Sequence, residues 1–211
     1  SVYVDGLDIC DFPVEGLRKM VALVPQDPFL FSTTLRENLT YDSPERADPE
    51  LWIAADAAGL TEAIKDFSDG LSTMVGERGQ TLSGGQKQRA TLARGLVRGS
   101  PILLLDDCFS AVDTETEEKI LSGLTRLRED RTTMLISHRV STARHADRIL
   151  IIDNGRISEA GTHDELLALG GYYADLAAIQ SDQDQDRKRK ARLLKNLEEE
   201  TEILTNVAGA D

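Results

Sequence analysis

Two stretches decide the fold of this chain: Leu82-Ser83-Gly84-Gly85-Gln86-Lys87-Gln88-Arg89 and, one short helix later, Ile102-Leu103-Leu104-Leu105-Asp106-Asp107. The first places glycines at the start of a helix, where backbone N–H groups and the positive end of the helix dipole suit an anion. The second is an apolar strand that ends in two carboxylates, which suit a metal ion beside phosphate. Together the two stretches indicate nucleotide chemistry.

The composition excludes several classes of protein. The chain has 211 residues, 40% of them hydrophobic, which is enough to bury a core. Its formal net charge of -13 disfavours a general nucleic-acid binder, because the surface repels phosphate. The longest apolar runs, 102–105 and 149–152, are far shorter than the roughly 18 to 20 residues that cross a bilayer. We expect Cys10 and Cys108, which lack a metal-like spacing, to be small buried apolar residues.

The pattern changes along the first half of the chain. Residues 1–36 have the pattern of short strands joined by turns, including a buried strand over Met20–Val24 that predicts part of a core. Residues 37–98 have a mostly helical pattern. Within them, Asp48-Pro49 is typical of the N-cap and first position of a helix that ends at about Ala58.

Strands and helices alternate over residues 99–180, which predicts an α/β unit with a largely parallel sheet. A hairpin at Asn154-Gly155 ends the sheet, and Thr162 begins a last helix with a capping box completed by Glu165. The expected strands are 102–105, 132–136, 148–152 and 156–159, and the expected helices are 114–128, 140–145 and 163–169. Residues 181–211 follow as a charged C-terminal tail, which we interpret as helical or flexible.

Ser83 and Gln86 have the spacing of a capping box, so the start of their helix needs no ligand to explain it. The glycines between them are harder to explain, since each costs about 1 kcal/mol inside a helix and a cap does not require them. A backbone that another molecule approaches closely does require glycine. We therefore predict that Ser83, Gly84, Gly85 and Gln86 bind a terminal phosphate.

The string Leu82–Gln86 resembles the signature sequence of the ATP-binding cassette ATPases, and Val75–Gly79 resembles a loop that exporters of this family place just upstream. The resemblance covers residues 1–180, with five motifs in family order. It implies an α/β fold of the P-loop NTPase (RecA-like) type, in which a helical subdomain is inserted into a parallel sheet core. It also implies ATP and Mg²⁺ as cofactors.

Asp106 and Asp107 close the strand 102–105 at the carboxyl edge of the predicted sheet, where ligands usually bind. By resemblance this is the Walker B strand, in which Asp106 holds Mg²⁺ through its water shell. The next residue of the family is normally a glutamate that polarises the attacking water, and here it is Asp107. Because a misplacement of about 1 Å can cost about a hundredfold in rate, we expect nucleotide at the chain's own site to be hydrolysed slowly.

Three further residues match positions of the family. Gln26 resembles the Q-loop glutamine, which implies contact with Mg²⁺ and water, and the apolar stretch Phe29–Ser32 after it implies a face toward a coupling helix of a membrane domain. His138 resembles the switch histidine that contacts the γ-phosphate. Asp113, in the stretch Ser110–Asp113, resembles the D-loop aspartate, which implies communication across a dimer.

One motif of the family is missing from the sequence. No Gly-x-x-x-x-Gly-Lys-Ser/Thr occurs in it, so it contains neither the phosphate-cradling P-loop nor the aromatic residue that stacks on adenine. We expect the sequence to start after these motifs, with the first part of the core missing. The polypeptide by itself is then expected to bind ATP weakly or not at all.

The leading hypothesis is the C-terminal portion of the ATPase domain of an exporter, at the cytoplasmic face of a membrane. An intact signature beside a substituted catalytic glutamate resembles one subunit of a heterodimer with two unequal sites. The implied partners are a second, homologous subunit and the coupling helices of a transmembrane domain, with no nucleic acid. Two alternatives stay open, a soluble cassette ATPase that acts on nucleic acid and a noncatalytic interaction fragment.

Overall fold

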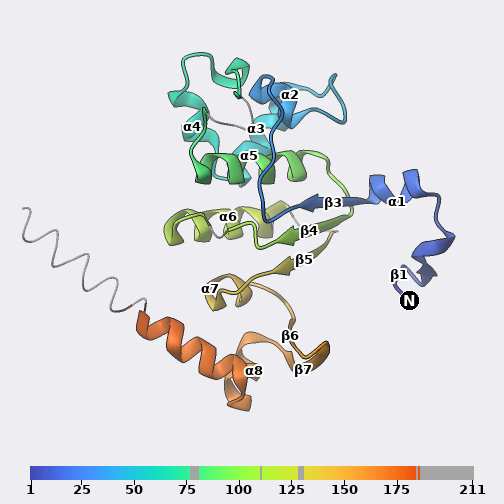
Figure 1. Cartoon of the computed structure of the whole chain (residues 1–211), viewed down its shortest axis with the longest axis vertical. Coiled ribbons are helices and arrows are strands. Elements are labelled where there is room, and N and C mark those ends of the chain that lie inside the picture. The colour runs from blue at the N-terminus through green and yellow to red at the C-terminus, as the bar shows by residue number, and fades with distance from the viewer. Residues whose placement is uncertain (77–80, 110, 128–130, 184, 186–211) are drawn as a thin grey trace, which may run out of the picture. The chain divides into compact units, whose positions relative to one another are not determined.

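The structure is a computed structural model that describes residues 1–76, 81–109, 111–127, 131–183 and 185 (Figure 1). The chain falls into two units, Ser1–His138 and Arg139–Asp211, and each is described by itself. The predicted charged tail lies almost entirely outside the described residues, so its interpretation stays a prediction.

The described strands at the centre of the first unit form a parallel sheet in the order β3-β4-β5, as the alternation of strands and helices predicts. In its register Val24 lies opposite Leu105, and Asp106 lies opposite Ile136. The carboxyl ends of neighbouring strands therefore meet at one edge of the sheet. The strands are β3 (Val21–Val24), β4 (Ile102–Asp106) and β5 (Thr132–Ile136).

The two faces of this sheet differ in burial. On one face Val24, Leu103 and Leu105 are 5% exposed or less and belong to the core. On the other face Leu23 and Met134 are 58% and 60% exposed. A parallel sheet is normally covered on both faces, so the exposed face is typical of a surface on which a further segment or subunit packs.

The helical part of the first unit confirms the pattern predicted for residues 37–98. Its described elements are α2 (Leu35–Leu39), α3 (Asp48–Ala57), α4 (Thr61–Asp66), a 3₁₀ turn η2 (Gly70–Ser72) and α5 (Gly84–Val97). Leu51, Leu60 and Ile64 are fully buried in it and belong to the same hydrophobic core as the sheet. After β4, the helix α6 (Thr114–Leu127) packs against α3. Residue 128, its predicted end, lies outside the described residues.

Helix α5 joins the helical part to the sheet. Gly95 lies so close to β3 that a Cβ atom there would be 2.5 Å from Cγ2 of Val24. Arg98, just after α5, donates to the carbonyl oxygens of Arg18 at 2.9 Å and Val21 at 3.3 Å. The same guanidinium lies 3.5 Å from Oδ2 of Asp42, which follows α2. These contacts fix the end of α5 against the beginning of β3.

The start of α3 corrects the sequence prediction by one residue. Its N-cap is Ala47, and Asp48 and Pro49 are the first two helical residues. The Asp48 carboxylate accepts a hydrogen bond from Nε of Arg36 at 3.0 Å. A charge-assisted bond to a guanidinium is stronger than a cap bond to a backbone N–H, which explains why Asp48 does not act as the cap.

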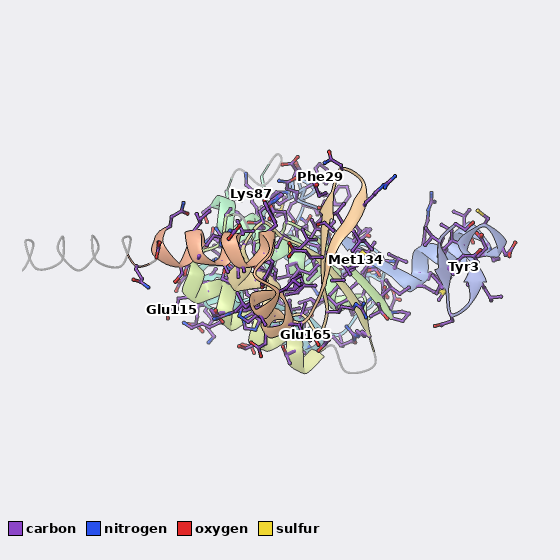
Figure 2. The ribbon with its side chains drawn as sticks, turned by 90° about the horizontal axis from the view of Figure 1, so that it is seen from below. Tyr3, Phe29, Lys87, Glu115, Met134 and Glu165 are labelled. Carbon is purple, nitrogen blue, oxygen red and sulfur yellow. The ribbon has the colours of Figure 1, made fainter. Side chains whose placement is uncertain are left out.

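The first 36 residues contain more helix than predicted. The hairpin of β1 (Tyr3–Val4) and β2 (Leu7–Asp8) has the expected short strands. Its side chains, Tyr3 among them, are mostly exposed (Figure 2). However, α1 (Val14–Met20) is helical, so Met20 ends a helix instead of beginning a strand. No residue of this fully described helix is buried, and an apolar stripe therefore does not mark it in the sequence.

The prediction for the two cysteines is half right, since Cys108 is buried but Cys10 is exposed. Cys10 lies in a 3₁₀ turn, Ile9–Asp11, and its backbone N–H donates to the side chain of Asp8 at 2.9 Å. The turn therefore holds the backbone of Cys10, while its side chain faces outward.

The second unit contains a hairpin and helices. Strands β6 (Ile149–Asp153) and β7 (Arg156–Gly161) pair antiparallel across the predicted Asn154-Gly155 turn, in which both residues have positive φ angles. Helices α7 (Val140–Ala143) and α8 (His163–Leu169) occupy the predicted places. Thr162 and Glu165 form the predicted capping box, and Gly170 ends α8.

Residues 172–183 are also helical, and the sequence did not predict this helix before residue 181. The backbone N–H groups of Tyr172 and Tyr173 donate to the carboxylate of Glu159, which lies on β7. A cap supplied from more than ten residues away is invisible to a search for local capping patterns. None of the described helices combines the length and the apolar composition of a membrane-spanning segment.

The difference in burial between two residues of α3 predicts different losses in the free energy of unfolding. Leu51→Ala removes a fully buried side chain and is expected to lower the free energy of unfolding by about 2 to 5 kcal/mol. Ile53→Ala, at a position that is 59% exposed on the same helix, is expected to change it by about 0.5 kcal/mol or less. Urea unfolding of both variants measures the difference. Equal losses would contradict the assignment of the core.

Candidate functional site

The carboxyl edge of the sheet brings together most of the predicted catalytic residues. Gln26 follows β3 by two residues, Asp106 ends β4, and His138 follows β5 by two residues. The side-chain amide of Gln26 donates from Nε2 to Oδ2 of Asp107 at 3.4 Å, across a sequence separation of 81 residues. This is the arrangement expected when the ends of adjacent parallel strands carry the polar groups of a site.

The backbone of Asp107 has an unusual conformation. Its φ of 40° lies in the left-handed region, which aspartate tolerates better than most residues that have a Cβ. Its N–H donates to the carbonyl oxygen of Ile136 at 3.0 Å and so continues the bonding between β4 and β5 by one residue. Backbone strain of this kind concentrates at functional sites, and here it turns the chain sharply after Asp106.

The next residue, Cys108, is excluded as a nucleophile. The pKa of its thiol is raised to about 12, mainly by burial and to a smaller extent by the neighbouring carboxylates of Asp107, Asp106 and Glu117. The thiolate is the reactive form of cysteine, so Cys108 remains a neutral buried residue at physiological pH.

This edge of the sheet is suited to a hard cation such as Mg²⁺ that binds together with a nucleotide. The part of the chain that is described contains no group of three or more acidic, histidine or cysteine side chains that could hold a metal ion. The edge offers the carboxylates of Asp106 and Asp107 and the amide of Gln26. Mg²⁺ commonly takes one or two carboxylates and fills its remaining positions with phosphate oxygens and water. The donor set therefore fits Mg²⁺ bound together with a nucleotide.

The signature residues lie at the start of α5. Ser83 is the N-cap: its Oγ accepts from the N–H of Gln86 at 3.2 Å, and its own N–H donates to Oε1 of Gln86 at 2.9 Å. The predicted capping box is confirmed, and these two residues satisfy each other. The N–H groups of the first turn, which include those of Gly84 and Gly85, have no acceptor in the preceding turn of a helix.

The two signature glycines have different surroundings. A Cβ atom at Gly85 would lie 3.3 Å from the carbonyl oxygen of Ala111, so packing within the chain accounts for this glycine. A Cβ atom at Gly84 would meet no described atom within 4 Å. The described part of the fold therefore gives no reason for glycine at position 84, and the contact with a terminal phosphate stays a prediction.

Asp113 has a structural role that the sequence did not reveal. Its Oδ1 accepts from the backbone N–H of Thr116 at 3.0 Å, in the geometry of an N-cap for α6. This bond holds the pKa of the Asp113 carboxyl below its usual value. The role across a dimer that the resemblance implies stays a prediction.

Gln88 is a candidate functional residue that the sequence motifs did not indicate. Its side chain is 2% exposed, and its Oε1 accepts from the N–H of Ala111 at 3.0 Å. The sequence does show a glutamine among the apolar residues of α5. Because a buried polar side chain needs a hydrogen-bond partner, such a residue indicates a contact with another segment.

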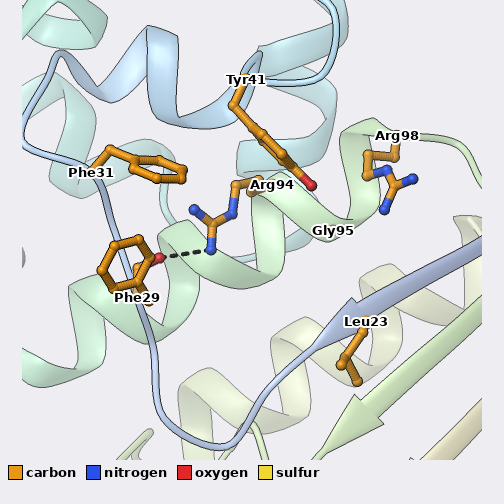
Figure 3. Close-up of a pocket in the computed structure, with 7 residues that line it drawn as sticks. All are labelled: Leu23, Phe29, Phe31, Tyr41, Arg94, Gly95 and Arg98. Atoms are coloured by element: carbon orange, nitrogen blue, oxygen red, sulfur yellow. Dashed lines mark hydrogen bonds between the residues drawn. The ribbon is translucent and has the colours of Figure 1, made fainter. Parts of the chain in front are cut away.

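The apolar stretch after Gln26 lines a pocket of about 170 Å³ on the first unit (Figure 3). The rings of Phe29 and Phe31 pack edge to face, with centroids 5.0 Å apart. Arg94 donates to the carbonyl oxygen of Phe29 at 2.7 Å, and its guanidinium carbon lies 5.6 Å from the centroid of the Tyr41 ring. The lining residues are Leu23, Phe29, Phe31, Tyr41, Arg94, Gly95 and Arg98.

Known proteins resemble this chain over most of its length. It is 45% identical over 184 residues to the ATP-dependent lipid A-core flippase of Burkholderia orbicola, covering 87% of this chain and 31% of the flippase. It is 42% identical over 203 residues to ATP-binding cassette sub-family B member 6 of Xenopus tropicalis, covering 94% of this chain and 24% of that protein. The chain therefore spans less than a third of the length of either relative.

A solved structure is also similar to this chain. The structure of a bacterial Atm1-family ABC exporter with ATP bound matches 84% of this chain and 31% of its own chain, with 43% sequence identity and a TM-score of 0.81. The family described as "ABC transporter" matches residues 1–110, which is more than half of the sequence. With the sheet-edge carboxylates and the signature helix in place, the chain belongs to the ABC transporter family.

Proposed function

We propose that the chain is part of the ATPase domain of an exporter that couples ATP binding and hydrolysis to transport across a membrane. The gathering of Gln26, Asp106 and Asp107 at the carboxyl edge of a parallel sheet carries this proposal. The relatives support it, since one is named as an ATP-dependent flippase and another as an exporter with ATP bound. Because the chain spans 31% of each, the transport activity of a whole protein is part of the proposal.

Each residue of the edge has a distinct task in this function. Asp106 and the amide of Gln26 hold Mg²⁺, which neutralises charge on the transferred phosphoryl group when it is bound. The carboxylate of Asp107 orients the attacking water, and the imidazole of His138 contacts the γ-phosphate. Phosphoryl transfer depends mainly on positioning and charge, which these fixed groups supply.

The site formed by Asp107 is slow in this proposal. Aspartate keeps the negative charge of glutamate but is one methylene shorter, so its carboxylate lies further from the water. The contact of Gln26 with Asp107 is long for a hydrogen bond at 3.4 Å and holds the carboxylate only weakly. Nucleotide therefore binds at this site but turns over slowly.

The signature serves a different nucleotide. Ser83, Gly84, Gly85 and Gln86 contact the terminal phosphate of ATP held by a second, homologous subunit, and Asp113 contributes to the same interface. The open surroundings of Gly84 support this assignment. An intact signature with a weakened carboxylate favours a heterodimer, in which the partner's site is the faster of the two.

The pocket beside Phe29 is the docking place for the transmembrane part. Phe29 and Phe31 are 51% and 46% exposed, and Tyr41 continues the same aromatic surface. We assign this surface to a coupling helix of a transmembrane domain, which places the chain at the cytoplasmic face of a membrane. The net charge of -13 disfavours the alternative of a soluble ATPase that acts on nucleic acid.

Lengthening the carboxylate tests the slow site. Asp107→Glu is expected to raise ATP turnover at this chain's own site by about tenfold or more, because it restores the reach of the carboxylate. The measurement is steady-state ATP hydrolysis by the complete dimer, with the catalytic carboxylate of the other subunit neutralised. Asp107→Asn, which has the same size without the charge, is the control and is expected to be slower than the parent. Unchanged turnover in Asp107→Glu would show that carboxylate length does not limit the rate.

The docking surface predicts that one substitution reduces transport without reducing nucleotide binding. Phe31→Ala in the complete protein is expected to reduce ATP-dependent transport about fivefold or more, because the coupling helix loses an aromatic contact. Nucleotide binding, measured in the same preparation, is expected to stay within twofold of the parent, roughly 0.4 kcal/mol. Ile53→Ala, which removes an apolar side chain that is 59% exposed on α3, is the control. Equal transport by the two variants would contradict the assignment.

A further inference from the structure

The segment that joins β4 to α6 is bound to the side of α5. At Ala111 its N–H donates to Oε1 of Gln88 at 3.0 Å. The carbonyl oxygen of Ala111 lies so close to Gly85 that a Cβ atom there would be 3.3 Å away. Both polar groups of Ala111 are therefore directed at the first turns of the helix that begins at Ser83.

The backbone N–H of Ala111 is a partner of the buried amide of Gln88. At 2% exposure its side chain is removed from water, and an unpaired amide in such a place costs roughly 1 to 3 kcal/mol. The neighbours on the same helix, Ala90 and Ala93, are fully buried and apolar. A glutamine at this point of α5 is explained by the bond it makes to the backbone of Ala111.

The described part of the joining segment is anchored at both ends. Cys108, Phe109 and Val112 are 1%, 2% and 4% exposed, and the N–H of Val112 donates to the carbonyl oxygen of Phe109 at 3.0 Å. At the other end, the N–H of Asp107 is bound to the end of β5. A displacement at Ala111 is therefore expected to reach Asp107 through a short segment in which the side chains of Cys108 and Phe109 are held in the core.

We propose that Gln88 is a positioning residue that couples the two nucleotide sites to which this chain contributes. The inference rests on the proposed function, in which the start of α5 holds the phosphate of one site and Asp107 serves the other. Gln88 lies about one helical turn, roughly 5 Å, beyond the signature glycines. Phosphate at the start of α5 fixes this turn, Gln88 fixes Ala111, and the anchored segment fixes the carboxylate of Asp107.

Gln88→Met tests this coupling because it keeps the length of the side chain and removes the acceptor. In the complete dimer, with the catalytic carboxylate of the other subunit neutralised, kcat for ATP hydrolysis at this chain's own site is expected to fall about 5- to 50-fold, because the carboxylate of Asp107 is misplaced. The KM for ATP is expected to stay within twofold. Gln88→Glu keeps an acceptor oxygen for the Ala111 N–H and is expected to recover most of the loss.

Thr91→Val is the matched control on the same helix. Thr91 is also 2% exposed, but its hydroxyl donates to the carbonyl oxygen of Lys87 within α5 at 3.0 Å and not to the joining segment. Its kinetics are expected to stay close to those of the parent. Gln88→Ala, which removes the acceptor without adding bulk, is expected to reproduce Gln88→Met and serves in its place if the methionine variant fails to fold.

Hydrogen exchange supplies a measurement that a merely structural role of Gln88 would not change. In the parent, saturating ATP is expected to slow amide exchange of the peptide 107–113, because phosphate at α5 orders the segment. In Gln88→Met this ATP-dependent slowing is expected to be lost, whereas Thr91→Val keeps it.

The outcomes separate the inference from the function on which it rests. If Gln88→Met behaves like Thr91→Val in both kcat and ATP-dependent exchange, Gln88 does not couple the sites, even though the parent hydrolyses ATP. If the parent dimer neither binds nor hydrolyses ATP, the proposed function fails and the inference fails with it.

Discussion

The parallel register of β3, β4 and β5 is the constraint on which the rest of the structure depends. Because Val24 is paired with Leu105 and Asp106 with Ile136, groups that are distant in sequence leave the sheet at the same edge. A shift of one residue would move Asp106 to the opposite face of its strand. The contact of Gln26 with Asp107 exists only in this register.

Helix α5 joins the residues of the signature to the aromatic pocket. Its first residue follows the signature serine, and its last turns line the aromatic pocket through Arg94 and Gly95. At 14 residues it is about 21 Å long. In the proposed function, one rigid element thus presents a phosphate-binding end to a second subunit and an apolar docking surface to a transmembrane domain.

Much of the site could be predicted because its residues follow local rules. The capping box at Ser83 and the strand ending in Asp106 are short patterns with a single physical explanation, and the structure has both. The prediction was wrong where a distant group decides the outcome. Asp48 binds Arg36 instead of capping α3. Glu159 caps the helix over residues 172–183, which has no capping pattern in its own sequence. The pairing of Gln88 with Ala111 was missed for the same reason, since its two partners are 23 residues apart.

At position 84, the residue that would make α5 more stable differs from the residue that the proposed phosphate contact needs. Glycine is a poor helix former, and an alanine there would meet no described atom, so the substitution would stabilise α5 by up to about 1 kcal/mol. A search for heat-resistant variants would therefore favour replacing this residue. In the proposed function, the phosphate contact that glycine permits at position 84 is obtained at this cost in stability.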